Sequence, residues 1–462
     1  MTPDKDKMTP DKMTADKTRH HMTPHKMTTE EILKIRHEHL LPSAVHTFRN
    51  PLHVTKASMQ WVWDNEGKKY LDAFGGIVTI SAGHNHPRIK NRLKAWMDED
   101  GPQHTTILYL SEPVADLARL FTSMTPDGLK RAFFTNSGSE ANEMAILLAR
   151  QYTQRFEIIA LRHAYHGGTT GTMSLVGQHS WKWGGPGLPG IAHAAQPNCY
   201  RCPWGAKPES CALECADDVE ETIRTSTSGE IAGAIIEPIQ GVGGFIVPPK
   251  EYFPRVHAIV KKYGGIYISD EVQTGVGRTG QHWFGILHNG VIPDMMTMAK
   301  GFGNGASIGA IATTDPIAES MRGKIHFNTY AGNPWATLQA AETLRILESE
   351  DVKTKATELG ELIQGELKEF QKSSRIIGDV RGRGLLIGLE LVKDLKTKAY
   401  ATEETLEVME QAKDRGLLIG KGGLYGNVLR ITPPMCITRQ DALDIVRILC
   451  ESIQATEKKM GY

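Results

Sequence analysis

The sequence predicts an α/β protein in which a large domain with a mainly parallel central sheet is joined to a smaller α+β domain. Three observations support this fold class. Short apolar runs alternate with helix-like stretches as far as about Trp335, which is typical of parallel strands linked by crossover helices. Each of these runs ends in a polar or glycine-rich turn. Beyond Trp335 the pattern changes to long amphipathic helices, so a second domain is expected there.

Charge and composition restrict the function of the 462-residue chain. Its 53 Lys and Arg residues balance 53 Asp and Glu residues, so it has no overall field with which to hold nucleic acid or an acidic membrane surface. No apolar run approaches the roughly 20 residues that cross a bilayer. Six Cys do not form a disulfide scaffold in a chain of this length, and a reducing compartment suits them. We therefore expect a cytoplasmic protein that acts on small molecules.

The first 26 residues repeat a short polar unit, with MTPDK, MTADK and MTPHK among its variants. Almost no apolar side chain is present to offset the entropy lost on ordering, so residues 1–27 are predicted to be disordered. The repeat contains Asp and little Arg, which argues against a mitochondrial transit peptide. We expect residues 28–80 to pack with the small domain, residues 81–335 to form the large domain and residues 336–462 to form the small domain.

Helices and strands can be placed in chain order from the apolar pattern. The expected strands of the large domain cover Ala132–Thr135, Glu157–Leu161, Ile231–Ile236, Gly265–Ser269 and Met295–Met298, and a helix is expected over Glu140–Tyr152. The small domain is expected to contain helices over Ala336–Ser349 and Val352–Ser373 and strands over Gly384–Leu391 and Val428–Ile431. Ligands of open α/β sheets bind beyond the carboxyl ends of the strands, so functional residues are expected there.

Three of the predicted strand ends carry residues that suit one ligand. The turn Asn136–Glu140 precedes a helix, where free amides and the positive end of the dipole bind phosphate; a plain serine N-cap is the alternative. Asp270 can hold a cationic nitrogen protonated, or it caps a turn, or it binds a metal together with Glu271. Lys300 among apolar residues can attack an aldehyde to form a Schiff base, although a lone Lys is usually a surface charge. Pyridoxal phosphate has all three partners, namely a phosphate, a ring nitrogen and an aldehyde.

With these motifs, the sequence from about residue 30 to about residue 455 resembles the class III aminotransferases, which are pyridoxal-phosphate enzymes of fold type I. The matching segments occur in the same order as in that family: DAFGGI (72–77), GHNHP (83–87), NSGSEAN (136–142), AYHG (164–167), IEPIQG (236–241), SDEVQTG (269–275), AKG (299–301), NTYAGNP (328–334) and LRITPP (429–434). The segments FGGIVTI and PMCIT resemble the alanine:glyoxylate branch, and relatives near that branch include 4-aminobutyrate aminotransferases.

The resemblance implies how the cofactor would be held. Lys300 would carry it as an internal aldimine and then act as the base that moves the substrate proton. Asp270 would keep the pyridine nitrogen protonated so that the ring withdraws electrons. Gly138 and Ser139 would bind the phosphate through amides and a hydroxyl.

Four further positions match the family's cofactor contacts. Tyr165 would stack on one face of the ring and Val272 would press on the other, while Gln273 would approach the phenolic oxygen; ordinary core packing is the alternative for these three. Thr329 matches a phosphate-binding threonine that the neighbouring subunit contributes. The resemblance therefore implies a homodimer, or a tetramer built from it, in which the subunits share active sites.

The resemblance also implies the reaction. Arg430 matches the Arg that clamps a substrate carboxylate, and Glu237 matches a Glu that pairs with this Arg in members that admit an ω-amine first and a 2-oxo acid afterwards. The alternative for Glu237 is a strand-end residue paired elsewhere. We expect a ping-pong transfer of an amino group from an α- or ω-amino acid to pyruvate, glyoxylate or 2-oxoglutarate. Racemases, decarboxylases and phospholyases of the same family are the rival functions, and a non-catalytic protein would be expected to lack Lys300 or Asp270.

Four of the six Cys lie within 17 residues, at Cys199, Cys202, Cys211 and Cys215. Four thiolates at this spacing can form a tetrahedral structural zinc site, although short-loop pairs are not a strict match to zinc fingers. Free thiols and disulfides are the alternatives. A catalytic role is not expected, because no motif His or Asp is adjacent to them.

Overall fold

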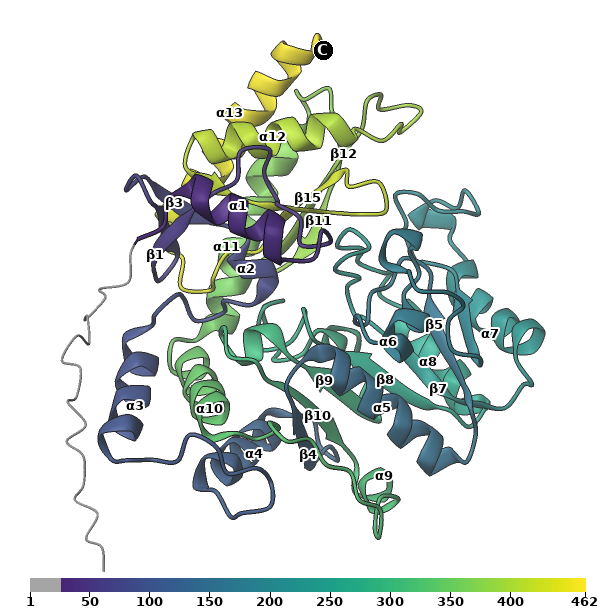
Figure 1. Ribbon diagram of the computed structural model, residues 1–462. Coiled ribbons are helices and arrows are strands. Elements are labelled where there is room, and N and C mark those ends of the chain that lie inside the picture. Colours follow the sequence, from purple (N-terminus) through teal and green to yellow (C-terminus); the bar gives the residue numbers. More distant parts are fainter. Residues whose placement is uncertain (1–25) are drawn as a thin grey trace, which may run out of the picture. The chain divides into compact units, whose positions relative to one another are not determined.

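The computed structural model describes residues 26–462 (Figure 1), so all but the last two residues of the predicted disordered extension, 1–27, lie outside it. The described chain divides into two compact units, one ending at Thr47 and one covering Phe48–Tyr462. The first contains helix α1 (Thr29–His39), which begins with a capping box. Thr28 Oγ1 accepts the Glu31 N–H at 3.2 Å, and Glu31 Oε2 accepts the Thr28 N–H at 2.8 Å.

A seven-stranded sheet forms the centre of the second unit (Figure 1). Its strands in spatial order are β4 (Arg131–Thr135), β10 (Gly309–Thr313), β9 (Met295–Met298), β8 (Ile266–Asp270), β7 (Ile231–Ile236), β5 (Glu157–Leu161) and β6 (Ile191–Ala194). β9, β8, β7, β5 and β6 run parallel, while β10 is antiparallel to both of its neighbours. The predicted α/β fold with a mainly parallel sheet is therefore confirmed.

Helices cover both faces of this sheet, and this burial explains why its strands are continuous apolar runs. Tyr267 of β8 packs in a cluster with α7 (Glu214–Ser226) and α8 (Tyr252–Lys262). Its neighbours Ile266 and Ile268 point to the other face and pack with α5 (Gly138–Thr153). All residues of β7, β8, β9 and β10 are buried.

The C-terminal part contains a second, antiparallel sheet in the order β11 (Ile377–Arg383), β12 (Leu386–Leu391), β15 (Val428–Ile431) and β14 (Gly420–Gly422). α11 (Val352–Gln371) and α12 (Thr402–Asp414) pack on this sheet, and α13 (Arg439–Met460) packs on both of these helices. α10 (Pro334–Ser349) packs instead with α3 (Pro87–Asp98) and α4 (Glu112–Met124). A third sheet joins β1 (Val54–Ser58), β2 (Trp61–Asp64) and β3 (Lys69–Asp72) to β13 (Leu417–Leu418). β3 and β13 are parallel neighbours, so the chain after Phe48 shares a sheet with the C-terminal part. The predicted domain boundaries, and the packing of residues 28–80 with the small domain, stay predictions.

The remaining elements connect these layers. They are α2 (Gly75–Val78), α3 (Pro87–Asp98), α4 (Glu112–Met124), α6 (Thr170–Leu175) and α9 (Asp315–Glu319), with the 3₁₀ turns η1 (His179–Trp181), η2 (Pro208–Ser210), η3 (Gly285–Asn289) and η4 (Lys300–Phe302). None of the helices within residues 26–462 combines the length and the apolar character that a membrane span requires.

The predicted elements agree with the structure within a few residues, and one difference has a clear cause. The strand expected over Gly384–Leu391 begins only at Leu386, because Gly384 has φ +54° and turns the chain from β11 into β12. A Cβ at this position would lie 2.5 Å from the carbonyl carbon of Thr279. Both the dihedral angle and the close approach therefore require glycine.

We expect Gly384→Ala to destabilise the protein strongly, because it adds a backbone clash to the strain of a left-handed alanine, which by itself costs roughly 1 to 3 kcal/mol. Gly290→Ala is the matched control, since Gly290 also has positive φ (+67°) but a Cβ there meets nothing within 4 Å. Thermal unfolding monitored by circular dichroism should show a clearly larger decrease in Tm for Gly384→Ala. Equal decreases for the two variants would contradict the close approach.

Candidate active site

A cavity of about 190 Å³ lies at the carboxyl ends of β8 and β9, beside the N-terminus of α5. Its lining includes most of the predicted site residues. The lining residues are Gly138, Ser139, Asn142, Tyr165, His166, Gly167, Glu237, Asp270, Val272, Gln273, Ala299 and Lys300. Residues more than 160 positions apart in the sequence therefore meet at the edge where ligands of α/β sheets bind.

Lys300 directly follows Ala299 at the end of β9 and has a left-handed backbone, with φ +47°. Such a conformation is strained for a residue with a side chain and is often found at functional sites. Burial lowers the pKa of the Lys300 amine to about 8, although Asp270 and Glu237 act in the opposite direction. At pH 7 about a tenth of the amine is then neutral, against well below a thousandth for an ordinary lysine.

Asp270 ends β8, and its buried carboxylate is held by three donors. Oδ2 accepts the Asn142 side-chain amide at 2.8 Å and the His166 Nδ1–H at 2.7 Å, while Oδ1 accepts the Val272 N–H at 3.1 Å. These contacts fix the orientation of the carboxylate toward the cavity. Asn142 and His166 were not predicted as site residues, although both lie within segments that match the family. Asn142 is one helical turn after Gly138, on the same face of α5, and this spacing could have identified it.

The N-terminus of α5 forms the opposite end of the cavity. Ser137 Oγ caps the helix by accepting the Glu140 N–H at 3.2 Å. The amides of Gly138 and Ser139 have no partner within the helix, because they belong to its first turn. Ser139 Oγ accepts the Gly168 N–H at 3.1 Å, which leaves its own hydrogen available. A Cβ on Gly167 would lie 2.5 Å from Ser139 Oγ, so the glycine allows this close approach. The amides, the hydroxyl and the positive helix end together suit an anionic group.

Two predicted ring contacts, Tyr165 and Val272, line the same cavity. The Tyr165 ring packs edge-on against Trp181, with ring centroids 5.3 Å apart. Val272 follows Asp270 in the turn after β8, and its methyl groups lie 3.2 Å from the position that a Cβ of Gly138 would occupy. Gly138 thus leaves space beside Val272 that any larger residue would fill.

Arg430 of β15 is buried beside the cavity and contacts Gln273. Its Nη2 donates to Gln273 Oε1 at 2.6 Å, and Nε has no hydrogen-bond partner. The guanidinium lies 4.6 Å from the Phe245 ring centroid and 5.7 Å from that of Phe74. Burial lowers the Arg430 pKa to about 10. A buried guanidinium with a free N–H and no carboxylate in contact is suited to binding an incoming carboxylate.

Glu237 does not form an ion pair with Arg430. Its Oε1 accepts the Tyr165 N–H at 3.0 Å, and its Oε2 accepts the Gly241 N–H at 2.8 Å. Burial raises the pKa of Glu237 to about 7, and the nearby Asp270 contributes to this increase. The predicted Thr329 is exposed and is not among the residues that line the cavity.

The structure supports neither of the two metal sites considered from the sequence, the four-cysteine zinc site and the site at Asp270 and Glu271. Cys199, Cys202, Cys211 and Cys215 line one small cavity of about 20 Å³, but all are free thiols. No group of three or more His, Cys, Asp or Glu side chains within residues 26–462 is placed to hold a metal ion. Instead of joining a shared centre, the Cys211 thiol contacts Glu214 Oε2 at 3.8 Å and accepts the Leu213 N–H at 3.3 Å. The predicted zinc centre therefore gains no support from the structure.

The metal alternative for Asp270 and Glu271 fails for a different reason. Glu271 is fully buried, and both of its carboxylate oxygens are occupied. They accept hydrogen bonds from the Ser269 and Thr274 hydroxyls and from the Gly285 and Ile286 amides. Glu271 therefore secures the turns around the site and takes no part in the cavity.

Comparisons with known proteins agree with this geometry. The family model described as aminotransferase class III matches residues 43–453. A protein named alanine–glyoxylate aminotransferase 2 homolog 2, mitochondrial, from Arabidopsis thaliana is 43% identical over 415 residues, which cover 89% of this chain and 84% of that protein. A leucine/methionine racemase from Thermococcus litoralis is 36% identical over 420 residues, covering 89% and 92%. The structure of an (S)-enantioselective ω-transaminase from Thermomicrobium roseum aligns with a TM-score of 0.85 and 32% identity, covering 94% and 99%.

The reactivity of the Lys300 amine with aldehydes should rise with pH around its lowered pKa. Because only the neutral amine attacks, we expect the rate at which cofactor-free protein reacts with salicylaldehyde to increase as the pH rises through about 8 and then to level off. Stopped-flow absorbance measures this rate, and Lys300→Arg is the control for other lysines. A midpoint near 10.5, the ordinary lysine value, would contradict the effect of burial.

The cysteine cluster should behave as free thiols. We expect unfolded protein that has not been reduced to react with six equivalents of a thiol reagent per chain, and elemental analysis to find less than about half an equivalent of zinc. In the folded protein Cys215 should react slowly, because burial raises its pKa to about 12 and leaves little thiolate. One tightly bound zinc per chain would restore the metal-site hypothesis.

Proposed function

The chain belongs to the class III aminotransferases, and from this premise we propose that it transfers an amino group from an α- or ω-amino acid to a 2-oxo acid such as pyruvate, glyoxylate or 2-oxoglutarate. One observation carries the proposal. A neutralisable lysine, a carboxylate and an anion-binding helix end line one cavity, through Lys300, Asp270, Gly138 and Ser139, and the buried Arg430 contacts Gln273 in its wall. The names of the relatives support amino-group transfer to glyoxylate and the use of ω-amines.

The residues present fit pyridoxal phosphate. The N-terminus of α5 would hold the phosphate, and Asp270 would hold the ring nitrogen. Tyr165 and Val272 would cover the two ring faces, and Lys300 would bind the aldehyde carbon. When bound, this cofactor supplies an aldehyde that takes up the amino group and a protonated ring that withdraws electrons from the bond being broken.

The chain's own residues then perform the remaining tasks. The Lys300 amine, whose pKa is lowered to about 8, can take the proton from the reacting carbon of the donor and deliver it in the reverse half of the cycle. Asp270 supplies the charge that keeps the ring nitrogen protonated. His166 and Asn142 prevent this carboxylate from turning away, since both donate to Oδ2.

Arg430 would bind the substrate carboxylate by exchanging partners. Gln273 Oε1 occupies only one guanidinium donor, so an incoming carboxylate can replace it and also reach the unpartnered Nε. Glu237 would have to leave the amides of Tyr165 and Gly241 before it could pair with Arg430. We therefore propose that admission of an ω-amine involves breaking these two hydrogen bonds.

Assembly and location form part of the proposal. Thr329 lies on an exposed loop, which supports its contribution to the phosphate site of a neighbouring subunit and hence a homodimer. We propose a cytoplasmic location because a reducing compartment suits the six Cys, although the Arabidopsis relative is named mitochondrial. Balanced net charge supports small molecules as the partners, with no role in binding nucleic acid.

A racemase is the second candidate, and the 36% identity to the Thermococcus litoralis racemase favours it. The same lysine and cofactor serve both reactions, so the residues around Lys300 do not distinguish them. The difference lies in the fate of the donor. A racemase returns the proton to the opposite face of the same carbon, whereas a transaminase releases the donor as an oxo acid.

The decisive experiment is a panel of donors with three acceptors. Alanine, β-alanine, 4-aminobutyrate, ornithine and β-aminoisobutyrate are each incubated with pyruvate, glyoxylate and 2-oxoglutarate, and products are separated by chromatography. We expect transfer with at least one pair, and a loss of at least about 10⁴-fold in kcat for Lys300→Ala, because the cofactor attachment and the proton carrier are both removed.

The racemase alternative is tested in the same samples. Each enantiomer of alanine, leucine and methionine is incubated without an acceptor, and chiral chromatography follows the opposite enantiomer. Racemisation together with an absence of transfer for every donor and acceptor pair would overturn the transaminase proposal.

A further inference from the structure

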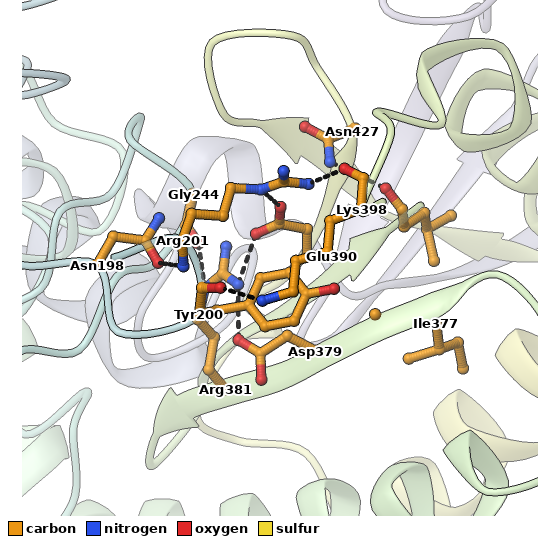
Figure 2. A network of polar contacts seen from close by, with 12 residues as sticks. Asn198, Tyr200, Arg201, Gly244, Ile377, Asp379, Arg381, Glu390, Lys398 and Asn427 are labelled. Atoms are coloured by element: carbon orange, nitrogen blue, oxygen red, sulfur yellow. Dashed lines mark hydrogen bonds and ion pairs between the residues drawn. The ribbon is translucent and has the colours of Figure 1, made fainter. Parts of the chain in front are cut away.

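A network of four charged side chains, built around one buried carboxylate, connects the loop around Arg201 to the antiparallel sheet of the C-terminal part (Figure 2). Glu390 of β12 lies at its centre, with a side chain that is only 4% exposed. Arg201 Nε donates to Glu390 Oε1, and Arg381 Nη1 lies 2.8 Å from Glu390 Oε2. Arg381 also pairs with Asp379 at 2.8 Å. Two positive and two negative charges are therefore balanced around a buried carboxylate, with Arg201, Arg381 and Asp379 only partly exposed to water.

Arg381 extends the network toward the active site. Its Nε donates to the carbonyl oxygen of Gly244 at 2.9 Å. The next residue, Phe245, is fully buried, and its ring lies against the Arg430 guanidinium at 4.6 Å. The position of the Phe245 ring thus depends on a backbone segment that Arg381 holds.

The strand pairing gives a second route between the network and Arg430. β12 and β15 are antiparallel neighbours in which Glu390 faces Val428 and Gly388 faces Arg430. Packing around this segment is close, because a Cβ on Gly388 would lie 3.2 Å from Phe245 Cβ and one on Gly244 would lie 3.2 Å from Arg381 Nη2. A displacement of Glu390 or Arg381 would consequently be transmitted to Phe245 and Arg430.

The far end of the network is fastened to the loop by several contacts. Arg201 Nη2 donates to the Lys398 carbonyl at 2.8 Å, and Lys398 Nζ donates to the Tyr200 carbonyl at 2.6 Å. The Lys398 ammonium also lies 4.2 Å from the Tyr200 ring centroid, and Arg201 lies 4.1 Å from that of Tyr400. The loop therefore presents Arg201 to Glu390 in a fixed orientation (Figure 2).

Stability alone does not explain this arrangement. Moving charges out of water has a cost that a buried ion pair often fails to offset, and apolar residues of similar volume frequently stabilise a protein as well or better. What buried ion pairs with several hydrogen bonds do provide is one defined geometry. Arg381 satisfies Glu390, Asp379 and the Gly244 carbonyl at the same time, which only the planar fork of arginine can do.

We propose that Arg381 and Glu390, supported by Arg201, position Phe245 and Arg430 for the carboxylate of the substrate. The inference rests on the proposed function, because it takes Arg430 as the group that binds this carboxylate. Arg381 and Glu390 are positioning residues that touch neither the substrate nor the cofactor. Their loss should impair recognition of the carboxylate and leave the chemistry at Lys300 unchanged.

The test uses two reagents that attack the same cofactor carbonyl. Aminooxyacetate carries a carboxylate, and O-methylhydroxylamine is its counterpart without one. The second-order rate constants of both with the holoenzyme are measured from the change in cofactor absorbance, and the ratio of the two constants reports carboxylate recognition independently of the physiological substrate. Circular dichroism and cofactor content verify that each variant is folded and loaded.

We expect Arg381→Lys to lower this ratio about ten-fold through the constant for aminooxyacetate, with the constant for O-methylhydroxylamine within two-fold of wild type. Lysine keeps the charge but cannot reach all three partners, so this variant should fold. Glu390→Gln should have the same direction of effect. Arg345→Lys is the matched control, because Arg345 pairs with Asp116 at 2.5 Å between α10 and α4 and contacts neither Gly244 nor Phe245.

Arg430→Gln separates the inference from the function on which it rests. A lowered ratio in Arg430→Gln together with a wild-type ratio in Arg381→Lys would overturn the positioning role while leaving the carboxylate site intact. An unchanged ratio in Arg430→Gln would overturn the carboxylate site itself, and the positioning proposal with it. An equal decrease in Arg345→Lys would show that any lost ion pair has this effect, which also contradicts the proposal.

Discussion

The buried carboxylate of Asp270 is the interaction on which the arrangement of the site depends. A carboxylate without hydrogen-bond donors at the end of a buried strand is costly and would turn toward water. Here Asn142 and His166 both donate to the same oxygen, so the direction of the carboxylate is fixed inside the protein. The two donors come from α5 and from the segment after β5, and their meeting with β8 requires the parallel order of the central sheet. The fold therefore determines the direction in which the Asp270 carboxylate points.

Burial also shifts the pKa values of the other ionisable groups near Asp270. Burial lowers the pKa of Lys300, while the negative charge of Asp270 acts against the decrease, and a reactive amine near neutral pH is the result. Glu237 shifts in the opposite direction for the same physical reason. Arg430 remains a cation at any pH in a cell, even though burial lowers its pKa to about 10. Burial thus shifts the pKa values of Lys300, Glu237 and Arg430, and each side chain is suited to a different role in the site.

Much of this could be predicted from the sequence, because strand ends and turn motifs are local. The five predicted strands of the central sheet and the lining positions of Lys300, Asp270 and Gly138 follow from apolar runs and the residues that end them. The reversed direction of β10 could not be predicted, because Gly309–Thr313 has the same apolar pattern as a parallel strand. The support of Asp270 by His166 depends on a contact between residues that lie 104 positions apart in the sequence. The network around Glu390 joins residues that lie more than 180 positions apart. The zinc prediction gained no support within residues 26–462, and spacing alone does not determine whether thiols point toward one centre.

The left-handed backbone of Lys300 has a cost in stability. Glycine would relieve the strain at that position, and an apolar side chain would remove a buried amine, so either change should make the cofactor-free protein more stable. The unpartnered Nε of Arg430 is likewise unfavourable for stability. Directed evolution that rewards heat resistance alone would therefore tend to erode the active site first. A programme to improve this protein should impose catalysis and stability together from its first round.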